Sequence, residues 1–117
     1  MATRILIVDD HPSFRAVARR LLVAEGYEVV GEEADGESGL AAVSALRPDA
    51  VLLDVHLPGI DGFEVAGRIA ATANGTAVIL TSSRDASDFG PLVEASGARG
   101  FVPKGELSGA ALRALLP

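Results

Sequence analysis

Five short apolar segments, each followed by a stretch with helical spacing, constrain the fold of this chain more than any other feature. The segments are rich in β-branched residues and bounded by turn-forming residues, which is typical of strands buried on both faces of a sheet. Strands that alternate with helices predict a parallel sheet with helices on both faces, joined by right-handed crossovers. The expected strands are residues 4–8, 27–33, 49–54, 77–80 and 100–104. The acidic end of the second, Glu32-Glu33, favours an edge position for it.

The helices expected between these strands have recognisable starts and stops. Pro12 suits the first turn of the first helix and Gly26 its end. The second begins at Asp35-Gly36 and stops at Arg47-Pro48, and the third begins at Asp61-Gly62 and is broken by Asn74-Gly75. The residues expected to face the core are Phe14, Val17, Ala18, Leu21 and Leu22 on the first helix, Leu40, Val43 and Leu46 on the second, and Phe63, Val65, Ala66 and Ile69 on the third.

The segment 84–97 is the least regular part of the chain. Phe89, Leu92 and Val93 have helical spacing, but Gly90-Pro91 interrupts them. A proline inside a helix costs about 3 kcal/mol, so a helix here is expected to start near Pro91. The last helix is expected over residues 107–116, with Leu112, Leu115 and Leu116 as its apolar face.

Composition excludes several classes of protein. A chain of 117 residues suits one domain, residues 1–117, and the absence of cysteine excludes disulfides and thiolate metal sites. A net charge of −6 and an aromatic content of 4% argue against a surface that contacts nucleic acid directly. No apolar run approaches the ~20 residues of a membrane span, and the first residues do not resemble a signal peptide. We therefore expect a cytoplasmic protein that does not enter a membrane.

Polar side chains stand at the carboxyl ends of four of the expected strands. They are Asp9 and Asp10, Asp54, Thr81 and Lys104. Each has an ordinary alternative role, as a helix or turn cap, a strand-end hydroxyl or a solvated surface charge. Parallel strands, however, share one edge at their carboxyl ends, and open α/β sheets bind their ligands there. We therefore expect these five side chains to form one cluster.

Such a cluster has a defined chemistry. Close carboxylates repel one another, so one pKa rises unless a cation intervenes. Oxygen donors point to Mg²⁺ rather than zinc, and Mg²⁺ usually takes one or two carboxylates plus a phosphate oxygen. A remaining carboxylate, Asp54, could then act as a nucleophile on phosphorus, with Lys104 stabilising the phosphoryl oxygens and Thr81 donating a hydrogen bond to them. Because Mg²⁺ prefers oxygen, neither His11 nor His56 is expected to bind it through the imidazole.

Over essentially its whole length the chain resembles the receiver domain of two-component response regulators. The residues that carry the resemblance are Ile7-Val8-Asp9-Asp10-His11, Leu52-Leu53-Asp54-Val55-His56-Leu57-Pro58-Gly59-Ile60-Asp61-Gly62, Leu80-Thr81 and Gly100-Phe101-Val102-Pro103-Lys104. The start at His11-Pro12 and the end at Lys104-Gly105 look like NarL/LuxR-type receivers, which are attached to helix-turn-helix domains. The resemblance implies a flavodoxin-like (βα)5 fold with strand order 2-1-3-4-5.

The resemblance also implies roles for individual residues. Asp54 would accept a phosphoryl group from a histidine kinase or phosphotransfer protein. Asp9, Asp10, Asp54 and the backbone carbonyl of His56 would bind Mg²⁺. Thr81 would swing toward the phosphate and Phe101 would turn inward, which alters the face made by the fourth helix, fifth strand and fifth helix. That face could form a homodimer, although Gly90-Pro91 departs from the usual fourth helix.

Two other functions compete with this interpretation. An aspartyl phosphatase of the haloacid dehalogenase type needs a second Asp two residues after the nucleophile, where this chain has His56. A receiver-like interaction module that no longer needs phosphate would not need the intact set of site residues. We therefore expect a phosphoacceptor that is not an enzyme, except for self-phosphorylation and self-dephosphorylation. It would act alone or as the receiver part of a DNA-binding transcriptional regulator.

Overall fold

The computed structural model of the chain describes residues 2–72 and 75–116. In it a parallel sheet has the strand order β2-β1-β3-β4-β5, the flavodoxin-like order that was expected. Strand β2 lies at an edge, as its acidic end indicated. The strands are β1 (Arg4–Val8), β2 (Glu28–Glu33), β3 (Ala50–Asp54), β4 (Ala77–Ser82) and β5 (Gly100–Pro103).

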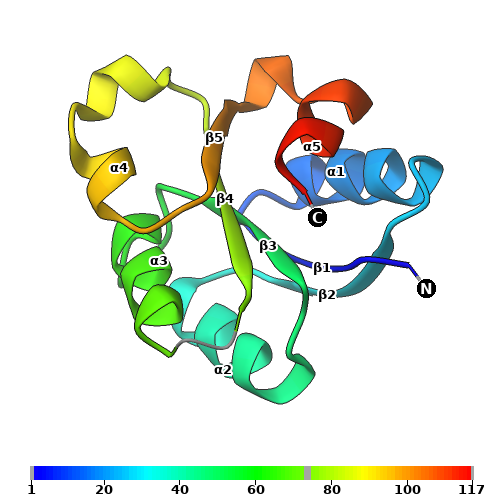
Figure 1. Cartoon of the computed structure of the whole chain (residues 1–117), viewed down its shortest axis with the longest axis horizontal. Helices are drawn as coiled ribbons and strands as arrows, with labels where there is room; N and C mark the ends of the chain where they lie inside the picture. Colours follow the sequence, from blue (N-terminus) through cyan, green and yellow to red (C-terminus); the bar gives the residue numbers. More distant parts are fainter. Residues whose placement is uncertain (1, 73–74, 117) are drawn as a thin grey trace.

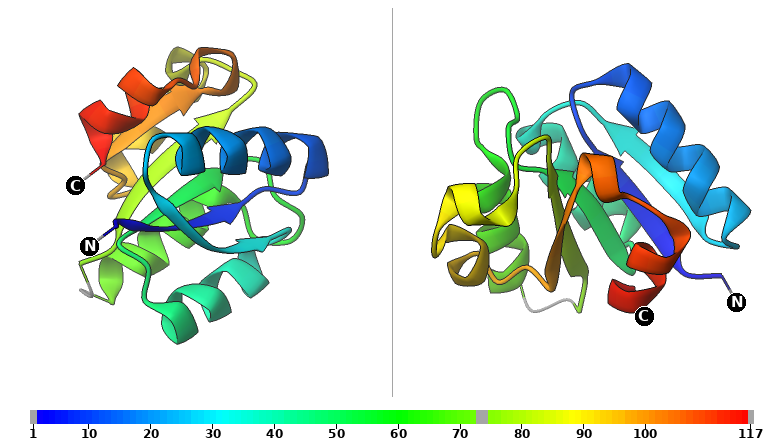
Figure 2. Two further views of the ribbon diagram at one scale, coloured as in Figure 1. Left: turned by 90° about the vertical axis from the view of Figure 1, so that its right-hand side faces the viewer. Right: turned by 90° about the horizontal axis from the view of Figure 1, so that it is seen from above.

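Helices cover both faces of this sheet. Helices α1 (Pro12–Ala24) and α5 (Gly109–Leu115) lie on one face, and α2 (Gly36–Leu46), α3 (Gly62–Ala71) and α4 (Leu92–Ala95) lie on the other (Figures 1 and 2). Successive strand residues point to opposite faces, so Ile5 and Ile7 pack under α1 and α5, whereas Leu6 and Val8 belong to the core beneath α2 and α3. Every residue of β3 is buried, because this strand is central and covered on both faces.

Helix α1 buries a narrower face than the sequence predicts. Ala18 and Leu22 are fully buried, and Phe14, four residues before Ala18, packs on the same core. Val17 was expected to be buried with them, but it is 48% exposed. Residues four apart form the inward stripe of a helix, and Val17 lies at the flank of that stripe.

Capping side chains fix the starts of three helices. The carboxylates of Asp35 and Asp61 accept hydrogen bonds from the backbone N–H of Ser38 (2.8 Å) and Glu64 (2.9 Å). The Ser108 hydroxyl accepts one from Ala111 at 3.1 Å, so the last helix begins at Gly109 and not at residue 107 as expected. Of the predicted break at Asn74-Gly75, Asn74 lies outside the described residues.

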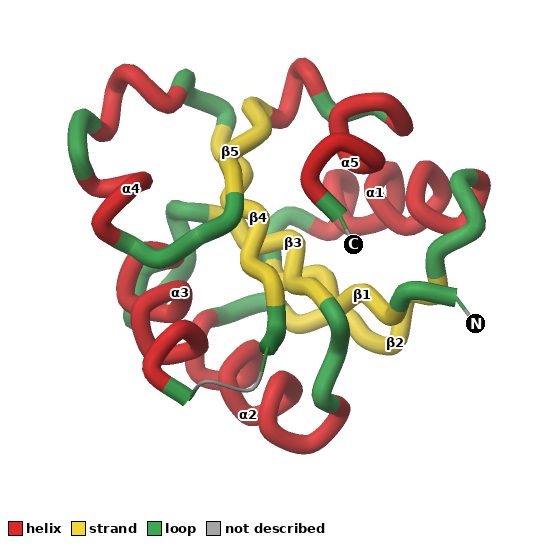
Figure 3. Tube along the Cα trace, in the orientation of Figure 1, coloured by secondary structure: helices red, strands yellow, loops and turns green. Residues whose placement is uncertain are grey.

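The connection from β4 to β5 contains only short helical pieces. A 3-10 helix, η1 (Ala86–Phe89), is followed by Gly90 with φ of 58° and by Pro91, which is the N-cap of the four-residue helix α4 (Figure 3). The predicted helix start near Pro91 is therefore confirmed. A second 3-10 turn, η2 (Lys104–Glu106), joins β5 to α5. The helices in the described part of the chain lack the length and apolar character needed to cross a bilayer.

Candidate functional site

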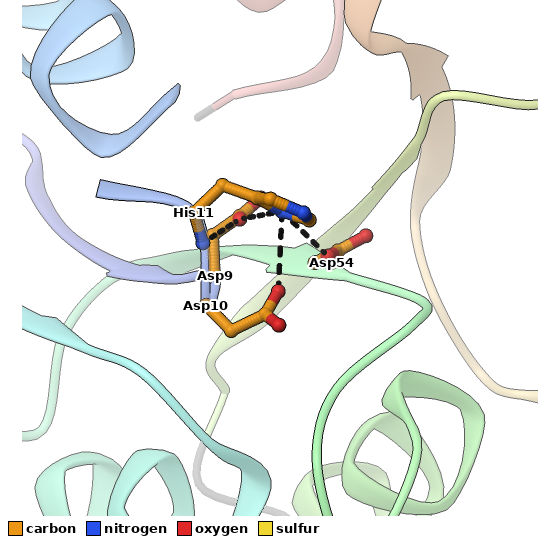
Figure 4. Close-up of side chains that lie close together, drawn as sticks. All are labelled: Asp9, Asp10, His11 and Asp54. Carbon is orange, nitrogen blue, oxygen red and sulfur yellow. Dashed lines mark hydrogen bonds and ion pairs between the residues drawn. The ribbon is translucent and has the colours of Figure 1, made fainter. Parts of the chain in front are cut away.

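The carboxyl ends of four strands bring the predicted polar residues together. Asp9 follows β1, Asp54 is the last residue of β3 and Lys104 follows β5. Thr81 of β4 is the register partner of Asp54, so the two lie side by side on neighbouring strands. Figure 4 shows Asp54 facing Asp9 and Asp10 across the edge of the sheet. The convergence predicted from the strand order is present.

Lys104 is the cation of this cluster. Its Nζ lies 2.8 Å from Asp9 Oδ2 and 3.6 Å from Asp54 Oδ2. The same ammonium lies 4.5 Å from the centroid of the Phe14 ring, which shields one side of it. Only 16% of the Lys104 side chain is exposed, so these interactions occur in a partly desolvated setting where charges interact strongly.

The carboxylate of Asp54 is buried with few partners. Asp54 is 2% exposed; its Oδ1 accepts a hydrogen bond of 3.3 Å from the His56 N–H, and its Oδ2 has no hydrogen-bond donor. Burial, followed by repulsion from Asp9, raises the pKa of Asp54, while Lys104 and the His56 N–H oppose the rise. A carboxylate held in this way has a free oxygen that can bind a cation or form a bond.

The Thr81 hydroxyl is a further polar group of the site without a hydrogen-bond partner, besides one oxygen each of Asp9, Asp10 and Asp54. Thr81 is 0% exposed, and its Oγ1 has no hydrogen-bond partner among the described residues. A buried hydroxyl without a partner costs about 1–3 kcal/mol. The cost is removed when a group with acceptor oxygens reaches the site beside Asp54.

His11 lies at the exposed rim of the acidic cluster, with 61% of its side chain accessible, and the sequence did not predict the orientation of its ring toward the carboxylates. It is the N-cap residue of α1, a position consistent with its place before Pro12. Its Nδ1 lies 3.1 Å from Asp9 Oδ1 and 3.1 Å from Asp10 Oδ1 (Figure 4). The only signal in the sequence was its adjacency to Asp9-Asp10, which does not show which way a ring points.

The loop from β3 to α3 is held against the end of the sheet by Gly62. The Gly62 N–H donates to the Val55 carbonyl at 2.8 Å, and the Val55 N–H donates to the Thr81 carbonyl at 2.9 Å. A Cβ atom on Gly62 would lie 2.2 Å from the Asp54 carbonyl oxygen. The sequence predicts only a helix start at Gly62, because the close approach of this residue to the Asp54 backbone depends on the packing of α3 against β3.

Phe101 belongs to a cluster of aromatic rings that contacts the loop from β3 to α3. It is half-buried, and its centroid lies 5.9 Å from that of Phe89 in η1. Phe89 also meets Phe63 of α3 edge-on at 5.4 Å and the exposed His56 at 5.8 Å. The short segment between β4 and β5 therefore contacts both the Asp54 loop and the strand that precedes Lys104.

The charges of the site decide what it can do. Three carboxylates (Asp9, Asp10 and Asp54) and one ammonium (Lys104) leave two negative charges if the imidazole is neutral. A divalent cation balances that charge, and the unpaired Asp54 Oδ2 fits such an ion. Asp9, Asp10, His11 and Asp54 each offer one atom in a group whose members lie within 4.8 Å of one another. The site can hold a divalent ion and still present an oxygen nucleophile.

Comparison with known proteins gives a consistent result. The family model described as "Response regulator receiver domain" matches residues 5–116. The DNA-binding transcriptional activator EvgA of Escherichia coli K12 is 34% identical over 101 residues, which are 86% of this chain and 50% of EvgA. The chain spans about half the length of the curated relatives it matches.

Two solved structures show the same similarity in three dimensions. A two-component response regulator of the LuxR family from Aurantimonas sp. SI85-9A1 has 32% identity and a TM-score of 0.86, over 97% of this chain and 81% of that chain. A chain of the CheX-CheY-BeF3-Mg²⁺ complex from Borrelia burgdorferi has 25% identity and a TM-score of 0.84, over 95% of this chain and 84% of that chain.

Proposed function

The chain belongs to the response regulator receiver domain family of two-component signalling, and from this premise we propose that Asp54 is its phosphoacceptor. The phosphoryl group would come from a phosphohistidine of a histidine kinase or phosphotransfer protein. The observation that carries the proposal is the buried Asp54 carboxylate, which has an oxygen without a hydrogen-bond donor beside both Lys104 and the Thr81 strand, whose hydroxyl also lacks a hydrogen-bond partner.

The transfer is a displacement at phosphorus. An oxygen of the Asp54 carboxylate forms the new P–O bond while the P–N bond of the donor phosphohistidine breaks. The electron pair of that bond returns to the imidazole nitrogen, which then takes a proton from water. Lys104, whose Nζ is 3.6 Å from Asp54 Oδ2, neutralises charge on the phosphoryl oxygens, as cationic side chains do in phosphoryl transfer.

Receiver domains bind Mg²⁺ at an acidic cluster, and the donor set of this chain fits that ion. We propose Asp9, Asp10, Asp54 and the backbone carbonyl of His56 as the groups that hold it. When bound, Mg²⁺ supplies positive charge to the oxygens of the transferred group. The similar chain from Borrelia burgdorferi was solved in a CheX-CheY-BeF3-Mg²⁺ complex, which supports both parts of the proposal.

Phosphorylation would act on the β4–β5 side of the molecule. A phosphoryl group on Asp54 adds acceptor oxygens and close to two negative charges. Thr81 would donate its hydroxyl to one of these oxygens, and Phe101 would turn further inward as Thr81 moves, which favours one arrangement of α4, β5 and α5. We propose that the face formed by α4, β5 and α5 is the interaction surface and that a homodimer is one of the complexes it forms.

An output on DNA is a second part of the proposal. EvgA, a named DNA-binding transcriptional activator, is about twice as long as the matched region. We propose that residues 1–117 form one receiver domain that either acts alone or controls the DNA-binding part of such a regulator. The reading frame beyond residue 117 distinguishes the two.

Receiver domains are generally phosphoacceptors rather than enzymes. A haloacid dehalogenase-type phosphatase would need an acid at the position of His56, so we propose no turnover beyond self-phosphorylation and self-dephosphorylation. Sustained hydrolysis of a generic phosphate ester would contradict this.

Phosphorylation with acetyl phosphate and Mg²⁺ tests the central proposal. Intact-mass spectrometry should show a gain of one phosphoryl group for the unmodified chain and none for Asp54→Asn. Asp61→Asn is the matched control, because Asp61 is an exposed helix cap and Asn caps equally well. An equal gain for the Asp54→Asn chain would overturn the assignment of Asp54.

A further inference from the structure

The His11 imidazole is held over the acidic cluster by its own backbone. The His11 N–H donates a hydrogen bond of 2.8 Å to Asp9 Oδ1, which fixes the residue beside the carboxylates. Its Nδ1 then lies 3.1 Å from oxygens of both Asp9 and Asp10 and 4.0 Å from Asp54 Oδ2 (Figure 4). The imidazole nitrogen therefore faces all three carboxylates at once.

These separations are those of atoms that share one metal ion. With metal–ligand bonds of about 2.1 Å, adjacent ligands of an octahedral ion lie roughly 3.0 Å apart and opposite ligands about 4.2 Å apart. The distances from Nδ1 to Asp9 and Asp10 match the first value, and the distance to Asp54 Oδ2 is close to the second. Small side-chain rotations would bring the four atoms around one ion.

An independent observation points to a ligand at this place. Asp54 is 2% exposed and its Oδ2, which faces the His11 ring, has no hydrogen-bond donor. Lys104 is too far from it, at 3.6 Å, to donate a good hydrogen bond. A cation between Asp54 Oδ2 and His11 Nδ1 would give the Asp54 oxygen a partner and would replace the 3.1 Å hydrogen bond between Nδ1 and Asp9 Oδ1.

We propose that the His11 imidazole is a ligand of this site and shifts its preference toward divalent ions that favour nitrogen, such as Co²⁺ and Ni²⁺, over Mg²⁺. Imidazole suits first-row transition metals, whereas Mg²⁺ selects oxygen donors. The inference rests on the proposed metal site at Asp9, Asp10 and Asp54, to which it adds a fourth side chain. A metal bound at Nδ1 also replaces the 3.5 Å contact between His11 and Lys104.

Metal binding to the chain and to its His11→Ala variant, measured by calorimetry with Co²⁺ and with Mg²⁺, tests this inference. We expect His11→Ala to weaken Co²⁺ binding by about tenfold or more and Mg²⁺ binding by less than about twofold, because only Co²⁺ gains from the nitrogen. Mg²⁺ is thus the internal control within each variant. Because the His11 side chain forms no cap hydrogen bond with α1, the variant should fold, and circular dichroism checks this.

A second measurement reads the ring directly. In ¹⁵N-labelled protein, the Nδ1 resonance of His11 should shift much further when the diamagnetic ion Zn²⁺ is added, because Zn²⁺ bonds to Nδ1, than when Mg²⁺ is added, because Mg²⁺ only binds the neighbouring carboxylates. If His11→Ala binds Co²⁺ as the unmodified chain does while Asp10→Asn loses both ions, the role of His11 fails and the carboxylate site stands. If neither ion binds the unmodified chain, this inference and the proposed metal site both fail.

Discussion

The helices that pack on the two halves of the sheet differ greatly in length. Around β2, β1 and β3, helices α1, α2 and α3 have 13, 11 and 10 residues. Around β4 and β5, α4 has four residues and α5 has seven, and the remaining helical pieces are 3-10 turns. Short helices are not stable alone and depend on the packing of a few side chains. Because fewer helical residues pack on the second half, we expect it to rearrange at lower cost than the first.

The candidate site lies on the boundary between these halves. Asp9, Asp10 and Asp54 belong to the half with long helices, whereas Thr81 and Lys104 belong to the half with short ones. A ligand that binds the three carboxylates and draws in Thr81 and Lys104 would move the weaker half and leave the stronger half in place. Carboxylates on the half with long helices, next to Thr81 and Lys104 on the half with short helices, form an arrangement suited to a conformational switch.

The largest expected effect on stability concerns Gly62, whose close contact with the Asp54 backbone holds the start of α3 against β3. Gly62→Ala places a Cβ atom 2.2 Å from the Asp54 carbonyl oxygen, so the start of α3 must move away from β3. Backbone overlap of this kind should lower the free energy of unfolding by about 3 kcal/mol. Urea unfolding followed by circular dichroism measures the loss.

Gly67→Ala on the same helix is the matched control. A Cβ atom there has no neighbour within 4 Å, so replacing Gly with Ala should stabilise the helix by about 0.5–1 kcal/mol. If both variants were equally stable, the start of α3 would be free to shift and the stronger half would be less rigid than we argue.

The same contrast explains what the sequence could and could not predict. Regular features determine the stronger half: the apolar strands, the caps Asp35 and Asp61, and the breaks at Gly26 and Pro48 are all local signals. The sheet order and the convergence of the five polar residues followed from those signals and from the family resemblance. Local patterns could also place the interruption at Gly90-Pro91.

Features that depend on side-chain direction were not predictable. Val17 has the spacing of a core residue, yet it is 48% exposed, because helix rotation is set by tertiary packing. Residue 107 was expected to start the last helix, but the competing cap at Ser108 delays it by two residues. The orientation of the exposed His11 ring toward Asp54 and Lys104 and the close approach of Gly62 to Asp54 depend on contacts between separate elements.

A smaller effect on the free energy of unfolding is expected when the proposed phosphoacceptor, Asp54, is replaced. Because the folded pKa of Asp54 is raised, the folded chain holds this proton to higher pH than the unfolded chain does. The contribution of Asp54 to stability is therefore complete below its unfolded pKa and is lost as pH rises through the folded pKa. At neutral pH the buried charge destabilises the protein, so Asp54→Asn should be more stable by on the order of 1 kcal/mol in metal-free buffer.

This gain should shrink as pH falls through the raised folded pKa of Asp54, and it should be gone below about 4, the usual pKa of a carboxyl group, where both states are protonated. Thermal or urea unfolding of both proteins across pH, with a chelator present, measures it. Asp61→Asn should show no comparable gain, since its carboxylate is exposed. An Asp54→Asn gain that did not change with pH would mean that burial of charge is not its cause.

The smallest expected effect concerns the ring of Phe89, which holds the weaker half against the stronger one. Phe89→Leu keeps an apolar side chain but removes the ring contacts with Phe63 and Phe101, and should lower the free energy of unfolding by about 0.5 kcal/mol. Amide hydrogen exchange should become faster in residues 84–97 and stay unchanged in β1 and β3, because local opening does not need the core strands to separate.

The variant Phe63→Leu is the control, because it removes the contact between Phe63 and Phe89 from the α3 side. It should also accelerate exchange in 84–97 but not in α3, which keeps its buried residues Val65 and Ile69. Faster exchange in α3 would show that the two halves open together and that the difference in helix length does not divide them.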